Sequence, residues 1–154
     1  MTSEIGDSGS GGGGRPLPPA LARLEATLVD ACAEPAEWPA QIAAGVYAGV
    51  DYVIANPALI QLELLDQTDG ITFYEGVIAR FAQLIRLRAP IQRRLPGSTD
   101  EALVASIVGL VGDHVRVGRL DRLAELRPEL VLLTLLPYLG FADAQRWANQ
   151  TAPS

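Results

Sequence analysis

Prolines and glycines divide this chain into segments whose apolar residues recur with the period of an α-helix. No segment keeps the alternation of a β-strand over a useful length, so packed helices are expected. The composition agrees, because 49% of the residues are hydrophobic and only 6% are aromatic. An apolar fraction carried by Ala, Leu, Val and Ile is typical of helix packing rather than of an aromatic-rich β-sandwich. We therefore expect an all-α, antiparallel helical bundle.

The breaks between segments predict where each helix begins and ends. A first helix carries Leu21, Leu24 and Leu28 and ends or is interrupted at Pro35. The residue before a proline avoids the α region, so a break is expected at Pro57. Ser98 or Thr99 is a candidate cap, while Pro137 and Gly140 are expected to bend the chain. The other expected helices cover residues 36–55, 58–66, 71–88, 99–117, 120–126, 128–136 and 141–149.

The length of 154 residues suits one domain with a substantial core. Residues 1–16 are rich in Gly, Ser and Pro and are predicted to form a disordered tail. Residues 17–150 are predicted to form one helical domain that binds a ligand and dimerises.

The charge and the cysteine content exclude several classes of protein. The formal net charge is -6, whereas a DNA-binding protein usually presents a concentrated basic face. Cys32 is the single cysteine, so no intramolecular disulfide can form. A lone cysteine is compatible with any compartment and slightly favours the cytosol. The N-terminus lacks the charged and apolar regions of a signal peptide, and the apolar stretches are too short to span a membrane. The expected location is the cytoplasm.

Two stretches resemble the C-terminal regulatory domain of TetR-family transcription regulators. The first is Trp38–Ile42 leading to Asp51–Leu59, where a Trp-bearing helix start precedes a long helix, a proline and a leucine-rich helix. The second is Leu132–Ala144, an apolar helix that ends in Pro-Tyr-Leu-Gly before a small polar helix. The resemblance covers roughly Leu17 to Ala148 and implies effector binding and homodimerisation. The family's N-terminal helix-turn-helix has no counterpart here, so no direct DNA binding by this chain is expected.

Two helices carry apolar residues on more than one side. The helix at 128–136 is apolar nearly all round, and a helix of this kind must be covered on all sides. One side covered by a second copy is an economical solution, and the resemblance implies a four-helix dimer bundle at these places. The alternative is a core formed wholly within one chain. The predicted dimer interface consists of Leu103, Ala105, Gly109, Gly112, Val131, Leu132 and Leu135.

Polar and aromatic residues inside otherwise apolar helices are the candidates for a binding pocket. A buried polar group needs a partner, and in a ligand-binding family a small molecule can be that partner. Each candidate also has a plainer interpretation as a surface carboxylate, a satisfied core histidine or a tyrosine at the edge of the core. The effector is expected to be small and mostly apolar, because the set offers few charges. The predicted ligand-binding residues are Tyr47, Asp51, Tyr74, Phe81 and His114.

Catalytic and metal sites find almost no support in the sequence. The single histidine, His114, lies far from Cys32 and has no glutamate at helical spacing. No glycine motif that cradles a phosphate follows a strand. We expect no catalytic residues, no metal and no cofactor. Two alternatives to the regulatory domain remain. The chain could be an interaction module that pairs with a full-length regulator, or it could be a truncated gene product.

Overall fold

The computed structural model describes residues 16–66 and 71–151, which form helices and no strand. The tail predicted over residues 1–16 lies outside the described residues, apart from Pro16. The helices are α1 (Pro19–Ala33), α2 (Trp38–Ala55), α3 (Pro57–Ile60), α4 (Ile71–Arg88), α5 (Thr99–Arg116), α6 (Leu120–Glu125), α7 (Arg127–Leu139) and α8 (Phe141–Thr151). A π-helical turn, η2 (Gln61–Leu65), continues α3, and a 3-10 turn, η3 (Ile91–Arg93), follows α4.

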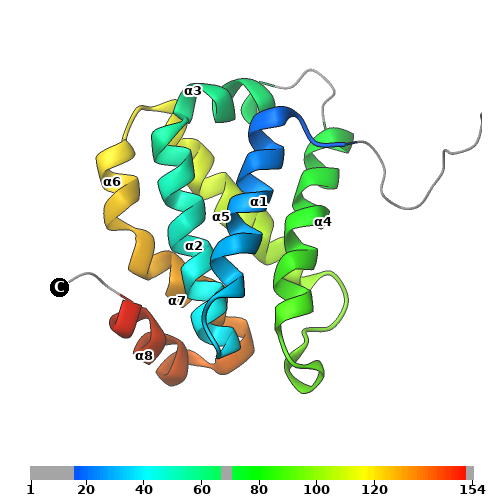
Figure 1. The fold of residues 1–154 in the computed structure, drawn as a ribbon, viewed down its shortest axis with the longest axis vertical. Helices are drawn as coiled ribbons and strands as arrows, with labels where there is room; N and C mark the ends of the chain where they lie inside the picture. The colour runs from blue at the N-terminus through cyan, green and yellow to red at the C-terminus, as the bar shows by residue number, and fades with distance from the viewer. Residues whose placement is uncertain (1–15, 67–70, 152–154) are drawn as a thin grey trace, which may run out of the picture.

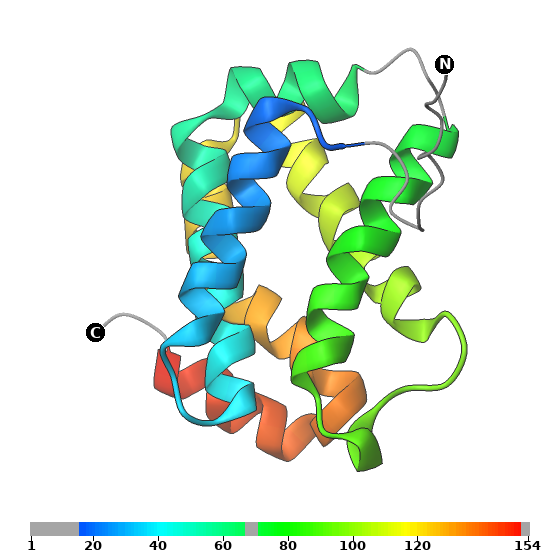
Figure 2. The ribbon, with the colours of Figure 1, turned by 45° about the vertical axis from the view of Figure 1, so that its right-hand side comes forward.

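The helices form an antiparallel bundle, which confirms the expected all-α fold (Figure 1). The helices α1 and α2 form a hairpin, and α4 and α5 form a second antiparallel pair. The segment formed by α3 and η2 crosses one end of the bundle, while α7 and α8 pack together at the other end. Figure 2 shows α1 and α4 running in the same direction along one side, with α5 behind the space between their backbones.

The N-terminus of α1 is capped by a residue distant in the sequence. The first amides of a helix lack partners within the helix. Here Oε1 of Glu63, in η2, accepts hydrogen bonds from the backbone amides of Ala20 and Leu21 at 2.8 and 3.0 Å. The Tyr52 hydroxyl donates to the Ala20 carbonyl at 2.9 Å. These contacts attach the start of α1 to η2 and to the end of α2.

The structure corrects three of the expected helix ends. The second helix begins at Trp38 rather than residue 36, with Pro39 in its first turn. Neither candidate cap of α5 forms a side-chain cap, and the Thr99 hydroxyl instead donates back to the Pro96 carbonyl at 2.8 Å. Pro137 lies inside α7, which runs to Leu139 instead of ending near residue 136 as expected. The helix ends at Gly140, whose φ of 82° favours glycine.

Two buried clusters form most of the core. The larger one joins α1, α2, α4 and α5 with single residues of the other elements, and its least exposed members are Leu21, Leu123 of α6 and Leu130 of α7. The smaller one packs α2 against α7 and α8. Within the described residues, no single helix is long and apolar enough to cross a membrane. Only α2 and the segment Pro57–Leu65, taken together, meet the criteria of length and composition, and the two are bent by 95° relative to each other.

Candidate functional site: an apolar cavity between the helices

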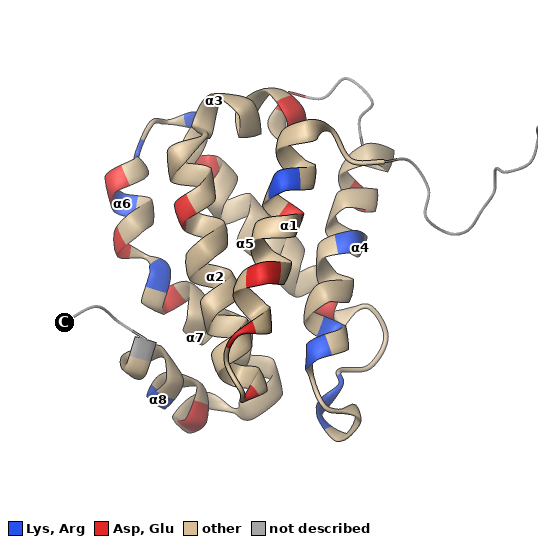
Figure 3. Ribbon diagram, in the orientation of Figure 1, with Lys and Arg blue, Asp and Glu red and all other residues tan. Residues whose placement is uncertain are grey.

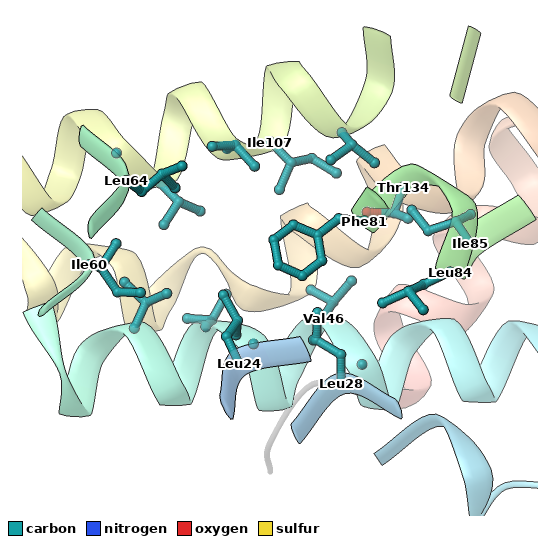
Figure 4. A pocket seen from close by; sticks show the side chains of 18 of the residues that line it. Leu24, Leu28, Val46, Ile60, Leu64, Phe81, Leu84, Ile85, Ile107 and Thr134 are labelled. Carbon is teal, nitrogen blue, oxygen red and sulfur yellow. The ribbon is translucent and has the colours of Figure 1, made fainter. Parts of the chain in front are cut away.

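A cavity of about 180 Å³ lies inside the larger cluster. Its walls come from α1, α2, α4 and α5, with η2 at one end and α7 contributing Thr134 (Figure 4). The Phe81 ring extends from α4 into the middle of the labelled side chains, between Val46 of α2 and Ile107 of α5. The lining residues are Leu24, Leu28, Cys32, Ile42, Gly45, Val46, Gly49, Val50, Val53, Ile60, Leu64, Leu65, Phe81, Leu84, Ile85, Val104, Ile107, Val108, Val111, Gly112 and Thr134.

The lining is hydrocarbon except at two side chains, Cys32 and Thr134. The Thr134 hydroxyl already donates a hydrogen bond of 2.7 Å to the Leu130 carbonyl. A buried water needs two to four polar partners, so this cavity does not suit ordered water. An empty apolar cavity of this volume costs about 4 kcal/mol relative to a filled core. The site therefore favours an apolar occupant.

Two glycines of α2 allow α1 to pack against the cavity wall. A Cβ atom at Gly45 would lie 2.8 Å from the Cys32 sulfur, and one at Gly49 would lie 3.0 Å from a Leu28 methyl carbon. Distances this short force a neighbour to move. The glycines thus set the close approach of α1 to α2, while α1 and α4 stay further apart on the other side of α1.

Side chains rather than close backbones join α1 to α4, and we call this junction the α1–α4 seam. Halfway along, Arg80 pairs with Glu25 through two hydrogen bonds of 2.6 and 3.0 Å, and the hydrogen bond raises the Arg80 pKa. One turn further, Leu28 and Leu84 both line the cavity. Figure 3 shows acidic residues on α1 and basic residues on α4, the two helices of the seam.

The last contact of the seam joins Cys32 to Arg88. Burial raises the pKa of the Cys32 thiol, and the charge of Arg88 with its hydrogen bond to the thiol opposes that rise in part. A thiol with a raised pKa stays protonated near neutral pH and is a poor nucleophile. The polar groups at this end of the cavity therefore suit binding better than covalent chemistry.

Of the five predicted ligand-binding residues, Phe81 lines the cavity and the other four do not. Tyr47 and Asp51 lie on another face of α2, toward the start of α7. There Asp51 pairs with Arg127 at 2.6 Å, and the Arg127 guanidinium lies 5.1 Å from the centre of the Tyr47 ring. These residues hold α2 to α7 at a place separate from the cavity.

Tyr74 and His114 also lie elsewhere. Tyr74 borders a shallow surface depression between α4 and the start of α5, with Glu75 and Glu101 nearby. His114 is half-buried, and its Nδ1 lies 2.9 Å from the Leu110 carbonyl one turn earlier in α5. Helical spacing showed which residues share a face but not which face turns toward the cavity.

The predicted dimer residues divide into two groups. Val131 and Leu135 are fully buried within the single chain, Leu103 is 7% exposed, and Gly112 packs where a Cβ would lie 3.1 Å from a Leu65 methyl carbon. These four contribute to the core of one chain. The half-buried residues Ala105, Gly109 and Leu132 remain accessible to a partner.

The aliphatic lining from α1, α2 and η2 was missing from the sequence-based site. A signal for it was present in Gly45 and Gly49, which lie one turn apart in a mostly apolar helix. Among the residues that the structure describes, no group of His, Cys, Asp and Glu side chains is arranged to hold a metal ion.

Comparisons of the chain with family models, curated proteins and solved structures found no match in any of the three.

Proposed function

We propose that this chain is a regulatory domain of the TetR type, which binds a small apolar effector in the cavity and forms a homodimer. The observation that carries this proposal is the cavity of about 180 Å³ with its almost wholly hydrocarbon lining. Ligand pockets between bundle helices have this composition, with few polar groups among apolar side chains. The role is binding rather than catalysis, since the lining offers only a hydrogen-bonded hydroxyl and a protonated thiol.

The positions of the resembling stretches support the family part of the proposal. Trp38 begins α2, and Pro57 separates α2 from the leucine-rich segment that closes one end of the cavity. The second stretch forms the end of α7 and the start of α8, with Thr134 reaching the cavity. Both stretches thus border the proposed effector site.

A thermal-shift titration with benzene tests the binding site. Benzene enters an apolar cavity of about 150 Å³ in another protein, so it is a suitable probe. A ligand that binds only the folded state stabilises it by about 2.7 kcal/mol at a hundredfold excess over its dissociation constant. We expect Val46→Phe, which fills the cavity, to abolish the stabilisation that benzene gives the unmodified chain.

Val29→Phe is the matched control, because Val29 lies on the same pair of packed helices but is 38% exposed outside the cavity. This variant should keep the full response to benzene. The proposal fails if benzene stabilises none of the three proteins, or if it stabilises Val46→Phe as strongly as the unmodified chain.

The proposal also predicts no tight duplex DNA binding by this chain, because its net charge is -6. Fluorescence anisotropy at low salt should show no submicromolar binding to duplex DNA. Submicromolar binding that weakens with added salt would contradict this prediction.

A second candidate is an interaction module that pairs with a related full-length regulator. Exposed apolar side chains at the α7–α8 end favour association with some partner, since Phe141 is 63% exposed and Leu136 is 37% exposed. A monomer that does not bind benzene but forms a complex with a TetR-type protein would favour this function over the first.

A further inference from the structure

Among the described residues that line the cavity, only Thr134 of α7 has a side-chain oxygen. This residue is 1% exposed, so solvent water does not reach its hydroxyl. Figure 4 shows Thr134 and Ile85 at one end of the cavity and Ile60 and Leu64 at the other. A ligand that fills the cavity from end to end therefore brings one of its own ends against this threonine.

The Thr134 hydroxyl is able to accept a hydrogen bond, but its own hydrogen is already in use. A threonine hydroxyl has one donor hydrogen and two acceptor lone pairs. Here the hydrogen is directed at the Leu130 carbonyl, at an oxygen–oxygen distance of 2.7 Å. Within residues 16–66 and 71–151, no group donates a hydrogen bond to Oγ1 of Thr134. A ligand group that donates a hydrogen bond therefore matches this atom.

The rest of the lining selects against other kinds of polar ligand. No charged side chain lines the cavity within the described residues, and a buried ion without an opposite charge is far more costly than a buried hydroxyl. The Cys32 thiol, the other polar group of the lining, is a weak donor. A carbonyl or ether oxygen on the ligand would thus be buried without a strong donor, which costs free energy.

From this arrangement we infer that the effector is an uncharged hydroxy compound, an alcohol or a phenol, whose hydroxyl donates a hydrogen bond to Oγ1 of Thr134. Its hydrocarbon part lies beside Phe81. This inference rests on the proposed function and specifies the ligand of the same site. The cavity volume of about 180 Å³ exceeds that of a cavity of about 150 Å³ that accepts benzene, so one ring with a hydroxyl group fits.

Isothermal titration of benzene, phenol, benzaldehyde and benzoate at pH 7 tests the inference. The four probes share one ring, and they carry respectively no polar group, a donor hydroxyl, an acceptor carbonyl and an anion. The readout is the ratio of the phenol affinity to the benzene affinity in the same protein, because a change in cavity volume affects both ligands. Thr134→Val replaces the hydroxyl with a methyl group and should lower this ratio by about tenfold. Thr134→Ala removes the same oxygen and should lower the ratio by a similar factor.

Thr27→Val is the matched control. The Thr27 hydroxyl also donates to the carbonyl four residues earlier, that of Arg23, at 2.8 Å, but Thr27 lies on α1 outside the cavity lining. This variant should keep the ratio of the unmodified chain. Thr134→Ser retains the hydroxyl and should keep most of the ratio.

Each other outcome contradicts a stated part of the inference. An unchanged ratio in both Thr134→Val and Thr134→Ala, or an equal fall in Thr27→Val, would overturn the contact with Thr134, while benzene binding left the proposed function in place. A benzaldehyde affinity that falls as far as the phenol affinity would overturn the choice of a donor. Tighter binding of benzoate than of phenol would overturn the choice of an uncharged ligand. Failure of all four probes to bind the unmodified chain would overturn both the inference and the proposed function.

Discussion

Gly45 faces Cys32 so closely that a Cβ atom at residue 45 would lie 2.8 Å from the sulfur. Gly45→Ala should therefore lower the free energy of unfolding by about 1–2 kcal/mol, because the thiol must move from its position against Arg88. In a Cys32→Ala background the obstacle is absent, and the same change should instead stabilise the helix by up to about 1 kcal/mol. Urea denaturation of the four proteins measures this double-mutant cycle. Equal effects of Gly45→Ala in both backgrounds would show that the thiol does not restrict residue 45.

The Glu25–Arg80 pair should control the rate at which a ligand passes the α1–α4 seam. Arg80→Ala removes a pair whose arginine side chain is 41% exposed, so the stability loss should stay below about 1 kcal/mol. Association and dissociation of 1-octanol should both become faster, leaving the dissociation constant nearly unchanged. Stopped-flow competition with a fluorescent apolar probe measures the two rates.

Arg122→Ala provides the control for this experiment, because Arg122 pairs with Glu125 within α6 and lies away from the cavity. Its rates should match those of the unmodified chain. Unchanged rates in Arg80→Ala would place the ligand's path elsewhere.

Tyr138 should make the protein less stable at high pH. Burial, together with the charge of Asp100, raises the pKa of Tyr138 to about 12, against an ordinary value of 10.0. The folded state then holds a proton that the unfolded state has lost, so this contribution is full below pH 10 and declines as pH rises toward 12. The loss is on the order of 2 kcal/mol.

Tyr138→Phe tests the alkaline effect. Within the described residues the buried Tyr138 hydroxyl has no hydrogen-bond partner, so its removal should be neutral or stabilising by about 1 kcal/mol at pH 7. All twelve basic residues other than histidine are arginines, so no lysine titrates in the same range. Urea denaturation at pH 9 and pH 11 should show a smaller loss of stability in the variant. An equal loss in both proteins would assign the effect to other groups.

A substitution at Leu132 should disrupt dimerisation without disrupting folding. It is half-buried, whereas its neighbour Val131 is fully buried in the single chain. We expect the unmodified chain to be a dimer in light scattering at micromolar concentration. Leu132→Glu should give a folded monomer, because it places an unpaired charge in an apolar interface. Val117→Glu, at a side chain that is 69% exposed, should remain dimeric. A monomeric unmodified chain would refute the prediction.

Local chemistry in the sequence was sufficient to predict most of the helices. The break at Pro57 and the long helix at residues 71–88 follow from backbone restrictions and apolar periodicity, which act over a few residues. The expected end of the helix at residue 136 was wrong, because α7 continues through Pro137 to Leu139. The cap of α1 was also beyond local rules, since Glu63 lies 43 positions from Ala20.

The sequence alone determined the all-α class, the helix order and the presence of Phe81 on an apolar helix face. Tertiary structure alone decided which faces enclose a cavity, since this depends on how helices far apart in the chain pack together. It placed Asp51 against Arg127 rather than in the cavity, and it brought Arg88 of α4 to Cys32 of α1. Periodicity assigns each residue to a face of its own helix, but the separation of α1 from α4 depends on side-chain volumes such as the absent Cβ atoms of Gly45 and Gly49.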